Sequence, residues 1–118
     1  EVDSFCLQNK GWILEGCYAD LVAVALRYDP VLLFLNPGTK VCQHNCQNRL
    51  WEPHKYESKA AQDALLPFLL SWVAEYETRQ GPMSLREHSL LFDAYAGKKR
   101  KLIDQLLPTE IVASLRSL

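Results

Sequence analysis

The sequence predicts an α/β fold in which parallel strands alternate with helices and helix dominates by residue count. Three observations carry this prediction. Residues 31–35 form a continuously apolar run closed by Asn-Pro-Gly, which is typical of a strand buried on both faces of a parallel sheet. Residues 12–14 form a shorter apolar run closed by Glu-Gly. Elsewhere, apolar residues recur at the spacing of amphipathic helices.

Helical periodicity and terminating residues place the elements of the first two thirds of the chain. A short helix over 3–9 ends at Gly11, and a second over 19–28 ends before Pro30, because the residue before a proline avoids the helical region. A polar helical stretch covers 39–49. Residues 58–79 repeat apolar side chains at i, i+3, i+4 and i+7, and Pro67 inside this run predicts either a kink or a break between two helices.

The carboxyl-terminal part of the chain predicts two more helices and one more strand. Ser84 and Glu87 form a capping box, with serine at the cap and glutamate three residues later, and start a helix that ends at Gly97. Residues 98–104 predict a short strand, and residues 108–118 predict a closing helix. Strands and helices in this order are typical of a layered α/β domain.

Composition and charge argue against several classes of protein. At 118 residues the chain is one domain at most, and 48% hydrophobic with 23% charged residues is a globular composition. A net charge of -1 argues against a broad basic face for nucleic acid, and no apolar run approaches the ~20 residues that span a membrane. No signal peptide is visible and the four cysteines do not form a disulfide framework, so we expect a cytoplasmic protein with reduced thiols.

Glu15 is the first candidate functional residue, because it directly follows the apolar run at 12–14. A side chain at the carboxyl end of a parallel strand points into the crevice where such sheets bind ligands. In that position Glu15 can orient a metal-bound water or hold a substrate hydroxyl. The alternative is a glutamate that caps the next helix or faces water.

The second candidate is the loop at 49–56, which combines Arg49, Trp51, His54 and Lys55. An arginine fork and a lysine point charge suit phosphate oxygens, and phosphoryl transfer relies on cationic groups that neutralise spreading charge. The alternative is a solvated loop whose Trp51 packs on the core.

Other motifs favour structural roles or are absent. Cys42, His44, Cys46 and His54 lack the second matched pair of a zinc site, so half-buried thiols are the preferred interpretation. The basic run at 98–101 is either a solvated turn or a neighbour of a nucleotide phosphate or an acidic partner. The sequence contains neither G-x-x-x-x-G-K-[ST] nor G-x-G-x-x-G, so the chain has no glycine loop of its own for a pyrophosphate.

Taken together, these residues resemble a known family. Residues 12–21 (WILEGCYADL) and 34–38 (FLNPG) look like the third-strand motif and the next strand of bacterial P-loop kinases related to adenylate and shikimate kinases. Cys42, Cys46 and residues 48–56 (NRLWEPHKY) resemble that group's lid segment. Matches at 62–64, 83–88, 91–94 and 97–100 continue the resemblance over nearly the whole chain, and residues 51–56 are its most specific part.

The resemblance implies an ATP-dependent and magnesium-dependent phosphotransferase. Residues 1–118 would form one incomplete three-layer P-loop kinase-like domain from its third strand onward, with a lid-like segment over 39–80. By position, Glu15 resembles the strand-end carboxylate near magnesium and acceptor, and Arg49 resembles a catalytic group of the lid. Arg49, His54, Lys55 and Arg100 resemble groups that approach the nucleotide.

The family's first strand, phosphate loop, first helix and second strand have no counterpart here, and the sequence starts without Met. We therefore expect a processed product or an excerpt. In the family's sheet order, 2-3-1-4-5, the first strand lies between the third and fourth, so its absence leaves strand edges unpaired. The missing part belongs to the parent chain, comes from a second chain, or is replaced by rearrangement or swapping with another copy.

Two functions follow as hypotheses. The first is a kinase that transfers phosphate from ATP to a small hydroxyl or phosphate acceptor and is inactive as this isolated chain. The second is a truncated or degenerate relative that acts as a non-catalytic interaction or oligomerisation module. Neither hypothesis involves nucleic acid or a membrane.

Overall fold

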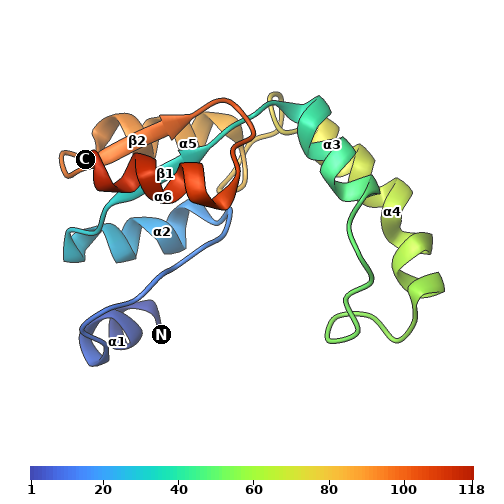
Figure 1. Ribbon diagram of the computed structural model, residues 1–118, viewed down its shortest axis with the longest axis horizontal. Helices are drawn as coiled ribbons and strands as arrows, with labels where there is room; N and C mark the ends of the chain where they lie inside the picture. Colours follow the sequence, from blue (N-terminus) through green and yellow to red (C-terminus); the bar gives the residue numbers. More distant parts are fainter.

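The computed structural model describes residues 1–118 and has a mixed α/β architecture dominated by helix (Figure 1). The elements in chain order are α1 (Val2–Gln8), α2 (Ala19–Ala25), the 3-10 turn η1 (Leu26–Tyr28), β1 (Leu32–Leu35), α3 (Thr39–Gln47), α4 (Lys59–Ala74), α5 (Leu85–Ala94), β2 (Lys99–Leu102) and α6 (Pro108–Arg116). The predicted helices are all present within a few residues of their expected ends. The predicted strands at 31–35 and 98–104 are β1 and β2.

The two strands form a parallel sheet, in register from Leu32 opposite Lys99 onward. Because successive side chains of a strand point to opposite faces, the two faces meet different helices. Phe34 packs against Phe92 of α5, with ring centroids 6.0 Å apart, whereas Arg100 bonds to the carboxyl end of α6. The sheet therefore lies between α5 and α6, and α2 packs beside α5 (Figure 1).

The predicted strand at 12–14 is wrong. Residues 12–16 are an irregular link between α1 and α2, and Ile13 is 92% exposed. A strand needs a neighbour to bond its backbone, and this run pairs with neither β1 nor β2. The same two-stranded sheet leaves the second edge of β1 open, with the backbone groups of Leu33 and Leu35 unpaired by any strand.

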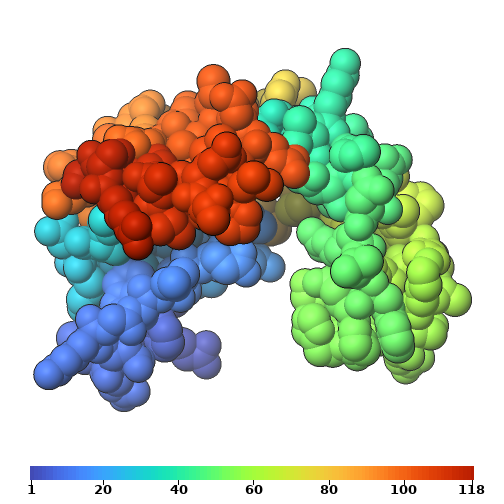
Figure 2. Space-filling view, in the orientation of Figure 1, coloured from blue at the N-terminus to red at the C-terminus, as the bar shows by residue number.

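Residues 39–80 form a helical arm that projects from the sheet. α3 and α4 pack against each other, and the Gln43 side chain donates to the Leu70 carbonyl at 3.1 Å. The chain enters the arm at Gly38 and leaves it at Gly81, both of which adopt positive φ angles of 103° and 95° that other residues rarely adopt. Figure 2 shows open space between the arm and the body of the molecule.

Pro67 does not divide α4, so of the two predicted outcomes the break is wrong. The helix runs without interruption from Lys59 to Ala74, and Ser58 caps it by accepting a hydrogen bond from the Ala61 amide at 3.0 Å. Pro67 is exposed, so the carbonyl left without its usual amide partner can bond to water. Even α4, the longest helix, is too short or too polar to cross a membrane.

The buried core is small for a chain of this length. The buried residues are Cys6, Ala19, Ala25, Phe34 and Ser84. Large apolar side chains stay in contact with water, among them Leu50, which is 85% exposed, and Phe68, which is 70% exposed. The elements therefore cover one another only in part.

Candidate functional site

The predicted site residues lie in three separate places. Glu15 is exposed on the irregular link before α2. Arg49, His54 and Lys55 lie in the loop between α3 and α4, at the end of the arm far from the sheet (Figure 1). Arg100 lies on β2. The structure therefore brings Arg49 and Lys55 together on the Glu52 carboxylate, leaves His54 in the same loop without a contact to them, and leaves Glu15 and Arg100 elsewhere.

Glu52 organises the cationic loop. Its Oε1 lies 3.3 Å from Nζ of Lys55, and its Oε2 lies 3.9 Å from Nη1 of Arg49. Oε2 is buried and accepts no hydrogen bond. Because two cations share one carboxylate, the cluster keeps a net positive charge. The arrangement can bind an anion whose oxygens compete with Glu52.

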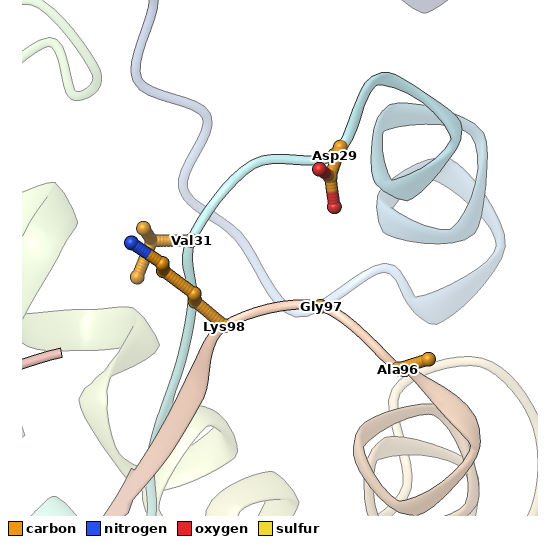
Figure 3. A pocket seen from close by; sticks show the side chains of 5 residues that line it. All are labelled: Asp29, Val31, Ala96, Gly97 and Lys98. Carbon is orange, nitrogen blue, oxygen red and sulfur yellow. The ribbon is translucent and has the colours of Figure 1, made fainter.

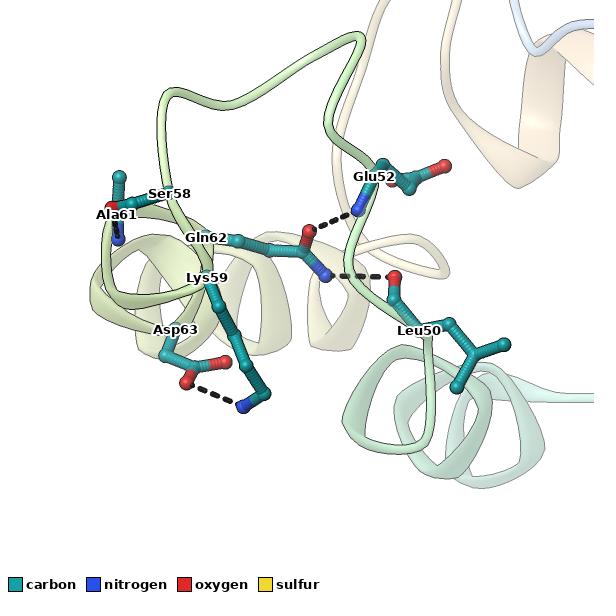
Figure 4. Close-up of polar contacts among 7 residues, drawn as sticks. All are labelled: Leu50, Glu52, Ser58, Lys59, Ala61, Gln62 and Asp63. Atoms are coloured by element: carbon teal, nitrogen blue, oxygen red, sulfur yellow. Dashed lines mark hydrogen bonds and ion pairs between the residues drawn. The ribbon is translucent and has the colours of Figure 1, made fainter.

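Gln62 fixes this loop on α4. Its Oε1 accepts from the Glu52 amide at 2.8 Å and its Nε2 donates to the Leu50 carbonyl at 3.1 Å (Figure 4). On the same turn of the helix, Lys59 and Asp63 pair with each other at 2.9 Å. No local sequence pattern predicts this role of Gln62, because its bonding partners lie ten and twelve residues away.

Arg100 is engaged by α6. Its Nη1 donates to the carbonyl and the hydroxyl of Ser114, both at 2.9 Å, and to the Ser117 hydroxyl at 2.7 Å. The carboxyl end of a helix presents unpaired carbonyls and a partial negative charge, which a guanidinium complements. Lys99 does the same for α5, donating to the Phe92 carbonyl at 2.6 Å. Two residues of the basic run at 98–101, Lys99 and Arg100, therefore cap the carboxyl ends of α5 and α6.

The link that contains Glu15 continues into a junction, where the amino ends of α2 and α5 lie beside the base of the arm. The Ala19 amide donates to the Pro82 carbonyl at 3.0 Å, and His88 bonds to the Cys17 carbonyl through Nε2 at 2.6 Å. The second ring nitrogen of His88 lies 2.6 Å from the Tyr76 hydroxyl. Burial, followed by the nearby cysteine thiols, raises the pKa of Tyr76 to about 12.

The cysteines carry free thiols. Burial, and then the neighbouring Cys46, raises the pKa of the Cys42 thiol, which keeps it protonated and weakly reactive. His44 lies on the same helix but bonds to Asn48. The structure places no group of three or more His, Cys, Asp or Glu side chains where they could hold a metal ion.

A hollow also lies at the amino ends of the strands, lined by Asp29, Val31, Ala96, Gly97 and Lys98 (Figure 3). The charged ends of Asp29 and Lys98 point apart in this view. Parallel sheets bind ligands at the opposite, carboxyl edge, and none of the predicted site residues lines the hollow. It is therefore not the candidate site.

The chain matches no family model, no curated protein and no solved structure.

Proposed function

We propose that this chain is part of an ATP-dependent phosphotransferase of the adenylate and shikimate kinase-like P-loop type, and that it does not transfer phosphate by itself. The observation that carries the proposal is the arm. It leaves the carboxyl end of β1 and holds Arg49 and Lys55 together at its tip, on either side of Glu52.

The architecture supports this function in two ways. The parallel strands are joined through helices, and the sheet lies between α5 and α6, an arrangement that places ligands at the carboxyl edge. The amino end of the ten-residue α5 lies on the side of the sheet where the strands end (Figure 1), and the partial positive charge of a helix amino end favours anions. Glu15 lies four residues before α2.

The residues present fit part of a magnesium–nucleotide site. Magnesium is usually held by one or two carboxylates together with phosphate oxygens, and Glu15 is exposed without an ion-pair partner. When bound, the metal neutralises charge on the phosphates. Arg49 and Lys55 would hold phosphate oxygens as the arm closes over the carboxyl edge. The glycine loop that cradles phosphates is absent from this sequence and must come from another segment or chain.

The test is a titration of the complete reading frame that contains residues 1–118 with ATP and Mg²⁺, followed by ADP formation with small hydroxyl acceptors. We expect Arg49→Ala to lower kcat/KM at least tenfold, because a cationic group on the transferred phosphate acts mainly in the transition state. The matched control is Arg116→Ala, which removes an exposed arginine at the far end of α6. If the two variants are equally active, Arg49 does not contact the transferred phosphate.

The small core and the open edge of β1 favour a second candidate, a non-catalytic interaction or oligomerisation module. Exposed apolar residues and an unpaired strand edge are the features that such a module uses for contact. Light scattering after size exclusion separates the two candidates in part. A monomer with a cooperative melt would argue against the module and against swapping between copies.

A further inference from the structure

We propose that His88 is a positioning residue that fixes the backbone beside Glu15 and ties it to the base of the arm. Only the consequence for Glu15 rests on the proposed function. The junction itself is held together by the contacts of His88 with Cys17, Tyr76 and Phe34.

The hydrogen-bond partners of His88 determine which of its ring nitrogens carries the hydrogen. Nε2 lies 2.6 Å from the Cys17 carbonyl, which can only accept, so Nε2 carries the hydrogen. In a neutral imidazole Nδ1 is then an acceptor, and the Tyr76 hydroxyl donates to it at 2.6 Å. The high pKa of Tyr76 agrees with this direction, because the phenol keeps its proton. The opposite tautomer would place two lone pairs against each other at the Cys17 carbonyl.

Ring packing fixes the imidazole from two further sides. The Phe34 ring of β1 meets it edge-on, with centroids 6.0 Å apart and planes at 81°. The Tyr76 ring lies 5.5 Å away. His88 therefore contacts β1, the end of the arm and the link before α2 at once, and its side chain has little freedom to turn.

The link before α2 needs such an anchor. It has no regular secondary structure, and two hydrogen bonds tie its end to the amino-terminal region of α5. One runs from the Ala19 amide to the Pro82 carbonyl and the other from His88 to the Cys17 carbonyl. Because Glu15 lies two residues before Cys17, losing the second bond frees the carboxylate to move relative to the strand ends. The Leu85 amide, which donates to the Tyr76 carbonyl at 3.1 Å, reports on the arm side of the same junction.

The experiment uses residues 1–118 and nuclear magnetic resonance. The nitrogen shifts of the His88 ring should show the Nε2–H tautomer at pH 7.5. His88→Phe keeps an aromatic ring against Phe34 and Tyr76 but removes both hydrogen bonds. We expect hydrogen exchange at the Ala19 and Leu85 amides to accelerate about tenfold, as expected from the loss of about one hydrogen bond at each side. His44→Gln, at an exposed histidine of α3, should leave both amides unchanged.

A second variant keeps the test decisive if His88→Phe fails to fold. Tyr76→Phe removes only the hydroxyl. The Nε2–H tautomer should persist because the Cys17 carbonyl still accepts from Nε2, and the Nδ1 shift alone should move as that atom loses its donor. The Nδ1–H tautomer in the natural chain, or unchanged exchange at Ala19 in a folded His88→Phe variant, would overturn the proposal. These readouts need no catalysis. An inactive complete reading frame would refute the proposed function and leave the role of His88 in the fold standing.

Discussion

Ser84 offers the sharpest test of how the fold is held together. It is the only polar residue that is buried, and its hydroxyl accepts from the Glu87 amide at 3.1 Å and donates to the Gly81 carbonyl at 2.7 Å. Ser84→Ala removes the cap of α5, which costs about 1 kcal/mol. It also removes one of the two hydrogen bonds that the Gly81 carbonyl accepts, since only the Ser84 amide at 3.1 Å remains, at a further cost of about 0.5 kcal/mol. We expect a loss of about 1.5 kcal/mol in the free energy of unfolding.

The matched control is Ser58→Ala. Ser58 caps α4 through one hydrogen bond to the Ala61 amide and is exposed, so water can replace the lost contact. We expect a loss of about 0.5 to 1 kcal/mol there. Urea unfolding followed by circular dichroism measures both variants against the natural chain. If Ser84→Ala lowers the free energy of unfolding no more than Ser58→Ala does, burial of the Ser84 cap adds nothing to stability.

Three further predictions concern charged and titratable groups. Arg100→Ala should accelerate hydrogen exchange in α6 about tenfold through loss of its carboxyl-terminal bonds; unchanged exchange would separate Arg100 from the helix. Tyr76, whose pKa is about 12, should ionise at a pH well above the ordinary tyrosine pKa of 10.0 in an absorbance titration. The step at high pH that disappears in Tyr76→Phe belongs to this residue. Since the folded pKa is the higher one, its contribution to stability is complete below pH 10 and is lost as pH rises toward 12. Glu52→Gln should strengthen binding of inorganic tripolyphosphate about threefold at low salt, because Arg49 and Lys55 lose their shared competitor; weaker binding in calorimetry would mean that Glu52 instead orients the cations.

Local patterns predicted most of the secondary structure. The cap at Ser84, the apolar spacing of α4 and the apolar run of β1 each depend on residues close in sequence, and each appears in the structure as expected. The run at 12–14 looked equally apolar but formed no strand. Its conformation depends on a neighbour that no local pattern specifies.

The candidate site was predictable only where its residues are close in sequence. Arg49 and Lys55 meet because a short loop holds them on one carboxylate. By position along the chain Arg100 resembles a group that approaches the nucleotide. Its bonds to the carboxyl end of α6 join distant residues, so no local pattern indicates them. The contact of His88 with Cys17 spans 71 residues, so only the folded chain reveals it.

Phosphotransfer is tested most directly by ADP formation from ATP and Mg²⁺, compared between the complete reading frame and residues 1–118 alone. We expect turnover by the complete frame and none by residues 1–118, which contain no glycine loop for the phosphates. Turnover by residues 1–118 alone, or a folded complete frame that forms no ADP with any small hydroxyl or phosphate acceptor, would contradict this expectation.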